Sequence, residues 1–231
     1  LANIGGCPEQ TVSVYIFSLF QNIGHLVAAE GIMEFLYAHP VYKQHLINPQ
    51  QQQTIMLGFS DGTKDGGYMQ ANWGIYRAKE NLTAISRKYN IKVRFFDGRG
   101  WPPSRGGGKT NKFYASLGNT IENEEIQLTI QGQTITSNFG TIQSSQFNLE
   151  QLLSAGISNE LFADTRVQIS HHDRHLLEEL GRTSYAAYQS FKTHPLFLTY
   201  LQQFSPLDYY SKTNIASRPA KRGGGGGLRF E

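Results

Sequence analysis

Two segments carry the side chains of this chain that are best suited to chemistry. Each begins with a short apolar run and continues into a polar, glycine-rich stretch. The first is IMLGFSDGTKDGG at residues 55–67, and the second is IKVRFFDGRGWPPSRGGG at residues 91–108. Glycine lets a backbone approach a ligand closely, and arginine supplies a planar fork of donors for phosphate or carboxylate. Together the two segments predict a site for a small, multiply anionic substrate and a metal.

Each segment offers particular candidates. Arg99 and Arg105 are the predicted anion ligands, Asp61 suits a divalent cation, and Lys64 suits an anionic substrate. The alternatives are a solvated loop for the arginines and an ordinary β-turn for Asp61. A nucleotide P-loop is excluded, because Pro103 stands where that motif needs its first glycine.

Apolar periodicity predicts strands and helices that alternate along the chain. This order implies parallel strands joined by crossover helices, so we predict an α/β fold that is part of a (β/α)8 barrel with additional long helices. Polar residues just after the strand ends would then lie at the carboxyl face of the barrel. The expected strands are 11–20, 54–59, 92–96 and 126–135, and the expected helices are 26–37, 69–89, 111–117 and 170–193.

Two parts of the chain differ in character. Residues 1–148 are predicted to hold the barrel strands and the active-site loops. Residues 149–231 are predicted to be mainly helical and to end in a substrate-binding motif and a flexible glycine-rich tail.

The composition argues against several classes of protein. The 231 residues carry a net charge of +3 without a block of lysine and arginine, which argues against nucleic-acid binding. No apolar run reaches the length of a membrane span, and Cys7 is the only cysteine, so no intrachain disulfide can form. We therefore expect a cytoplasmic protein.

Four motifs in order resemble those of the phosphoenolpyruvate carboxylases. Residues 55–82 resemble that family's LGYSDSxKDGG segment and the A-x-W-x-x-Y-x-A helix that follows it. DGRGWPPSRGGG resembles GRGGxxGRGG, IQLTIQG at 126–132 resembles R-V-T-E-Q-G, and ASRPAKR at 216–222 resembles G-S-R-P-A-K-R. The resemblance extends from about Val12 to Arg222, and the family's chains are several-fold longer.

The resemblance implies carboxylation of phosphoenolpyruvate by bicarbonate, with oxaloacetate and phosphate as products and Mg²⁺ or Mn²⁺ as cofactor. Asp61 and Gln21 would lie at the metal, Lys64 would be an anion-binding amine, and Arg99 would bind the substrate phosphate. Further substrate contacts would come from Arg218 and Gln131. Arg105 would hold bicarbonate or CO₂ near an inhibitory dicarboxylate site, and the assembly would be a homotetramer.

Some residues depart from the family pattern. Gln21 stands where a metal-binding glutamate is expected, and Asp97 stands where many members have histidine. Trp101 and Ser104 replace loop glycines, and Trp101 is large enough to crowd the pocket. Ile130 replaces the acid of the fourth strand.

The family's T-A-H-P-T-E motif and its C-terminal tail are absent from this sequence. We therefore expect the chain to be a fragment that is inactive alone. The alternative is a catalytically silent binding or scaffold subunit of the same fold with a weakened metal site.

Overall fold

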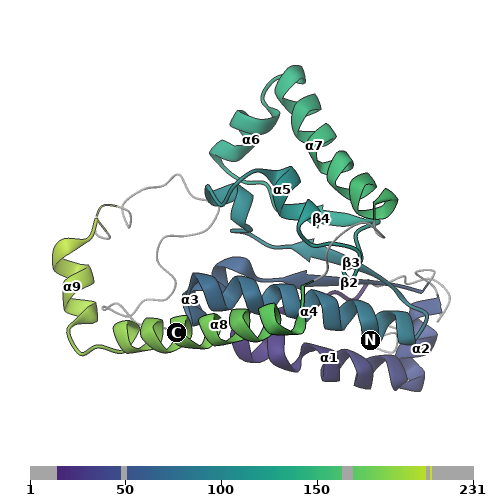
Figure 1. Cartoon of the computed structure of the whole chain (residues 1–231), viewed down its shortest axis with the longest axis horizontal. Coiled ribbons are helices and arrows are strands. Elements are labelled where there is room, and N and C mark those ends of the chain that lie inside the picture. Colours follow the sequence, from purple (N-terminus) through teal and green to yellow (C-terminus); the bar gives the residue numbers. More distant parts are fainter. Residues whose placement is uncertain (1–14, 48–50, 163–168, 207–208, 210–231) are drawn as a thin grey trace, which may run out of the picture.

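The computed structural model of this chain describes residues 15–47, 51–162, 169–206 and 209. Within these residues, four short strands form one parallel sheet in the order β1-β2-β3-β4 (Figure 1). Helices connect the successive strands, because parallel neighbours need a crossover connection. The strands are β1 (Ser18–Phe20), β2 (Gln52–Leu57), β3 (Lys92–Asp97) and β4 (Ile126–Leu128).

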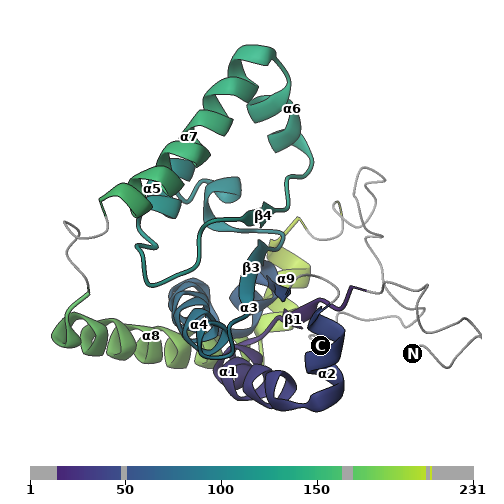
Figure 2. The same cartoon turned by 90° about the vertical axis from the view of Figure 1, so that its right-hand side faces the viewer.

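The helices form two groups, which lie apart in both views (Figures 1 and 2). One group packs α1 and α8 against α4, and the other packs α5 and α6 against α7 beyond β4. The helices are α1 (Ile23–Ala38), α2 (Pro40–Ile47), α3 (Phe59–Gly66), α4 (Tyr68–Lys88), the 3₁₀ turn η1 (Pro102–Arg105), α5 (Thr110–Ala115), α6 (Gln133–Phe139), α7 (Ile142–Leu161), α8 (His171–Lys192) and α9 (Phe197–Phe204). No helix in the described ranges combines the length and the apolar character that crossing a membrane requires.

The prediction of α4 from its apolar spacing is confirmed. Ile75, Ala78, Leu82 and Ile85 are all buried, so they form the face that packs against the sheet and α1. Asn90 follows the helix with a φ of 61°, a left-handed conformation that asparagine tolerates well. Helix α8 also matches its prediction closely, because Ser170 caps its first turn.

The strand register brings the carboxyl ends of all four strands to one edge. Phe20 pairs with Leu57, Leu57 pairs with Asp97, and Asp97 pairs with Leu128. The segments that follow these four residues therefore leave the sheet side by side. This edge is where the predicted site residues of the first three strands must lie.

The α/β class and the parallel strands are confirmed, and the described strands form an open sheet. Closure into a (β/α)8 barrel is not shown and stays a proposal. The first predicted strand begins in residues outside the described part, and β1 covers only its end. The division after residue 148 is likewise a proposal, and residue 148 lies inside α7.

The predicted extent of the fourth strand is wrong. The expected strand 126–135 ends at Leu128, because the chain turns at Gly132, whose φ is 58°, and then enters α6. Helix α1 ends at Ala38, close to the predicted end at residue 37, and Pro40 begins α2. Proline at a first helical position loses no hydrogen bond, since that N–H has no partner inside the helix.

Candidate functional site

Asp61 and Lys64 lie on α3, the short helix that follows β2. The β-turn alternative for this segment is wrong, because Phe59–Gly66 is helical. The helix puts the Lys64 Nζ 3.4 Å from Asp61 Oδ1, and both side chains stay accessible, with 78% and 41% of their surface exposed. The pair can therefore exchange its contact for one with a ligand.

Gln21 reaches the same place from the end of β1. Its Nε2 donates to Asp61 Oδ2 at 3.3 Å, so the two predicted metal-site residues are brought together. The backbone N–H of Ile23 donates to Asp65 Oδ2 at 2.9 Å, which joins the start of α1 to the end of α3. Asp65 is thus held at the helix terminus by a short hydrogen bond, whereas Asp61 has only long contacts, at 3.3 and 3.4 Å, which a cation could displace.

The donor set fits a weakly held Mg²⁺ or Mn²⁺. Asp61 offers carboxylate oxygens and Gln21 an amide oxygen, and magnesium sites often use one or two carboxylates with water and substrate oxygens. No group of three His, Cys, Asp or Glu side chains that could hold a metal occurs among the described residues. Further ligands would therefore come from water and from the substrate.

Arg99 and Arg105 are joined through Ser60. Arg105 Nη2 donates to Ser60 Oγ at 2.9 Å, and Ser60 Oγ donates to the Arg99 carbonyl at 2.8 Å. The Ser60 backbone N–H donates to the same carbonyl at 3.1 Å. In the part of the chain that the structure describes, no polar partner is recorded for the Arg99 guanidinium, which is exposed. Its five donors are therefore available to an anion.

Gly100 makes this close contact possible. Its φ is 91°, and a Cβ there would lie 3.0 Å from Arg105 Cζ and still closer to Ser60 Oγ. A larger residue would push the arginine away and strain the backbone. The absence of a side chain at Gly100 therefore lets Ser60 of α3 and Arg105 meet at the carboxyl edge.

A buried ion pair lies directly beneath the Arg99 loop. Lys79 Nζ on α4 is 2.7 Å from Asp97 Oδ1, and each side chain is only 1% exposed. The Tyr114 hydroxyl donates to Asp97 Oδ2 at 2.7 Å. Burial raises the pKa of Tyr114 far above its ordinary value, and the neighbouring Asp97 carboxylate raises it further, so the phenol stays protonated. Asp97 thus has a structural partner on each oxygen.

Trp101 does not crowd the pocket, so that expectation is wrong. Its ring is 4% exposed and packs against Phe113 and Tyr114. Its Nε1 donates to the Thr129 carbonyl at 3.0 Å, which ties the loop after β3 to the end of β4. The apolar ring is driven into the core instead of the site.

The structure does not test the two remaining predicted substrate residues. Gln131 follows β4 and is exposed, and no hydrogen bond is recorded for its side chain in the described structure. Arg218 lies outside the described residues. Their predicted roles are untested.

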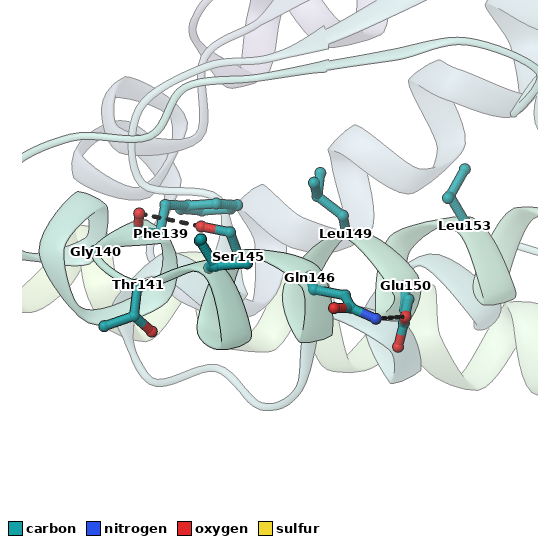
Figure 3. Close-up of a pocket in the computed structure, with 9 residues that line it drawn as sticks. Phe139, Gly140, Thr141, Ser145, Gln146, Leu149, Glu150 and Leu153 are labelled. Atoms are coloured by element: carbon teal, nitrogen blue, oxygen red, sulfur yellow. Dashed lines mark hydrogen bonds between the residues drawn. The ribbon is translucent and has the colours of Figure 1, made fainter.

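A shallow pocket lies elsewhere, between α6 and the first turns of α7 (Figure 3). Leu149 and Leu153 point to the same side of α7, and Gln146 donates to Glu150 at 2.7 Å. Glu150 is the one charged side chain among the described residues that line it: Phe139, Gly140, Thr141, Ile142, Ser145, Gln146, Leu149, Glu150 and Leu153. A site for a multiply anionic substrate needs cations, so this pocket is not the candidate.

Sequence reasoning did not assign roles to three residues that matter here. Ser60 links the arginines, and Lys79 and Tyr114 hold Asp97. A signal for Lys79 existed, because it lies beside the apolar positions Ala78 and Leu82 of α4. A lysine at such a helix position needs a buried partner.

Comparison of the sequence with known proteins points to one family. A family profile described as phosphoenolpyruvate carboxylase matches residues 1–229. Proteins named phosphoenolpyruvate carboxylase from Corynebacterium efficiens and Rhodothermus marinus are 33% and 34% identical, each over 92% of this chain and 23% of their own length. One from Corynebacterium diphtheriae is 32% identical over 90% of this chain and 23% of its own. The chain thus spans about a quarter of the curated relatives it matches, and it belongs to the phosphoenolpyruvate carboxylase family.

Proposed function

We propose that this chain forms part of an active site that carboxylates phosphoenolpyruvate with bicarbonate, giving oxaloacetate and phosphate. One observation carries the proposal: the ends of three adjacent strands bring Gln21, Asp61 and the Arg99 loop to one edge, and Ser60 links Arg105 to that loop. Cations and an oxygen-donor metal site at one edge suit a phosphorylated carboxylic acid.

Each residue has a proposed task. Arg99 binds the substrate phosphate, Arg105 holds bicarbonate or CO₂, and Lys64 binds a substrate anion. Gln131 and Arg218 supply further contacts with the substrate. Asp61 and Gln21 would hold Mg²⁺ or Mn²⁺, which when bound supplies positive charge for the phosphate and the enolate oxygen.

The proposed reaction has two stages. Bicarbonate attacks the phosphoryl group, which yields carboxyphosphate and the enolate of pyruvate. Carboxyphosphate then releases CO₂ and phosphate, and the enolate carbon captures the CO₂ to form oxaloacetate. Arg99 and Arg105 stay in place through both stages and offset the negative charge on phosphate and carboxylate.

Calorimetric titration of phosphoenolpyruvate into the longest native form of the protein tests this function. We expect binding that requires Mn²⁺ and that is lost in Arg99→Ala. Binding that is equal with and without Mn²⁺, or unchanged in the variant, would contradict the proposal. The matched control is Arg182→Ala, since Arg182 on α8 is exposed and pairs with Glu179 of the same helix.

A second candidate is a catalytically silent binding or scaffold subunit. It is favoured by the Gln21 contact, because a neutral amide binds Mg²⁺ more weakly than the expected glutamate and its N–H already occupies Asp61. A folded sample of the longest native form that binds no phosphoenolpyruvate and yields no oxaloacetate would favour this candidate. The homotetramer, the cytoplasmic location and a dicarboxylate inhibitor near Arg105 also stay proposals.

A further inference from the structure

Helix α3 is poorly suited to stand alone. It is eight residues long, it has glycine at two of those positions, and no side chain caps its N-terminus. Glycine is among the poorest helix formers, and isolated helices of this length are unstable in water. Contacts from elsewhere must therefore hold the helix that carries Asp61 and Lys64.

Three side chains from the last turns of α8 make four polar contacts at the C-terminus of α3. Tyr188 Oη donates to the Lys64 carbonyl at 2.9 Å, and Gln189 Nε2 donates to the Asp65 carbonyl at 2.7 Å. Lys192 Nζ is 3.3 Å from the first carbonyl and 3.1 Å from the second. The final carbonyls of a helix lack partners within it and favour a cation, so these donors match what that terminus requires.

The contact is built closely on both sides. A Cβ on Gly67, just after α3, would lie 3.1 Å from the Tyr188 ring, and the Lys192 ammonium lies 5.5 Å from the centre of that ring. Asp65 of α3 also accepts a hydrogen bond from the Ile23 N–H. This bond ties the end of α3 to the start of α1, two residues after Gln21. The end of α3 thus connects α8 with both predicted metal-site residues.

Helix α8 has separate attachments to α4 along its earlier turns, where it runs beside that helix (Figure 1). Arg174 makes two hydrogen bonds of 2.7 Å to Glu80, and Glu178 accepts from Trp73 Nε1 at 2.8 Å. Loss of the final contacts would therefore leave α8 docked on α4. The two functions of α8, docking and holding α3, can be separated by mutation.

We propose that Tyr188, Gln189 and Lys192 are positioning residues, which hold α3 and thereby set the placement of Asp61 for its ligand. The functional meaning of this contact rests on the proposed role of Asp61 at a divalent metal. The contact between α8 and α3 itself does not depend on that role.

Hydrogen–deuterium exchange in the longest native form tests the proposal with Tyr188→Phe/Lys192→Met. We expect amides of residues 59–66 to exchange roughly tenfold faster, since two donors at the helix terminus are lost, while amides of residues 75–85 keep their rates. Arg182→Met is the matched control, because it also removes a cation from α8 but one that pairs with Glu179. Two single variants at Lys192 add a second comparison. Lys192→Met should speed exchange in residues 59–66, whereas Lys192→Arg, which keeps a donor, should retain most of the wild-type protection.

Mn²⁺ affinity, measured by electron paramagnetic resonance on the same samples, gives the second readout. Faster exchange in α3 with severalfold weaker Mn²⁺ binding supports the proposal. Unchanged exchange overturns it, and so does faster exchange with Mn²⁺ affinity equal to that of the wild type. If the wild type binds no Mn²⁺ while α3 exchange responds, the positioning contact stands and the proposed metal role of Asp61 fails.

Discussion

Two lysine–aspartate pairs lie close to the carboxyl edge of the sheet, and they differ in almost everything except residue type. Lys79 and Asp97 are 2.7 Å apart, and each is 1% exposed. Lys64 and Asp61 are 3.4 Å apart, and 78% and 41% of their surfaces are exposed. The buried pair lies two residues before Arg99 in the chain, at Asp97, whereas the exposed pair is open to solvent.

The difference shows how environment assigns a role to the same side chains. Charges removed from water are stable only while they are paired, so Lys79 and Asp97 cannot be released for chemistry. Exposed ion pairs contribute little to stability and exchange partners readily. A ligand therefore has access to Lys64 and Asp61 at small cost to the fold.

The largest expected effect comes from breaking the buried pair. Asp97→Asn leaves the Lys79 charge buried without a counter-ion, and we expect the free energy of unfolding to fall by about 3–5 kcal/mol. Urea denaturation measures it. Asp61→Asn is the matched control and should cost less than about 1 kcal/mol. Equal losses in the two variants would contradict the assignment of different roles.

The next largest loss of stability is expected at the ion pair of Glu80 and Arg174, which is less buried than Lys79–Asp97. Glu80 is 12% exposed and accepts two hydrogen bonds from Arg174. We expect Glu80→Gln to cost about 2 kcal/mol at neutral pH, because hydrogen bonds to a charged group are lost. Urea denaturation should place this variant between Asp61→Asn and Asp97→Asn.

The pH dependence of that pair has a defined sign. Burial raises the pKa of Glu80, but hydrogen bonds from Arg174 and Thr120 lower it more, so the folded pKa lies below the ordinary 4.5. The carboxylate thus stabilises the fold above pH 4.5, and this stability is lost as the pH falls through the folded value. The difference in free energy of unfolding between wild type and Glu80→Gln, measured by urea denaturation across this pH range, should shrink below pH 4.5. A difference that does not change with pH would contradict the lowered pKa of Glu80.

A substitution at Gln21 tests the proposed metal site at Asp61. Gln21→Glu adds a second carboxylate beside Asp61, and we expect Mn²⁺ to bind about tenfold more tightly, since affinity follows the charge of the ligand set. Calorimetric titration of Mn²⁺ into the longest native form measures this. Equal affinities would remove Gln21 from the proposed site.

The smallest effect on stability is expected at Lys64. Lys64→Met should change the free energy of unfolding by less than about 0.5 kcal/mol, because the side chain is exposed. Phosphoenolpyruvate should nevertheless bind severalfold more weakly, as an anion loses a charged donor. Lys112→Met, at an exposed lysine on α5, is the control and should leave both quantities unchanged.

Much of the fold follows from local pattern. Apolar spacing predicts α4 and α8 closely, because the burial of one helix face depends on residues only three or four positions apart. Helix α3 was missed, since its glycines and polar residues are typical of a turn. Its C-terminal carbonyls accept hydrogen bonds from α8, more than a hundred residues later in the chain, and such contacts leave no local signal in the sequence.

The sequence by itself determined the α/β class, the family and the residue types at the strand ends. Those properties depend on local periodicity and on motifs that are readable residue by residue. Tertiary structure alone decided which charges are buried, that Trp101 faces the core, and that Ser60 joins the two arginines. Such outcomes depend on packing between distant segments, and packing determines which polar groups keep their water and which must find a partner in the protein.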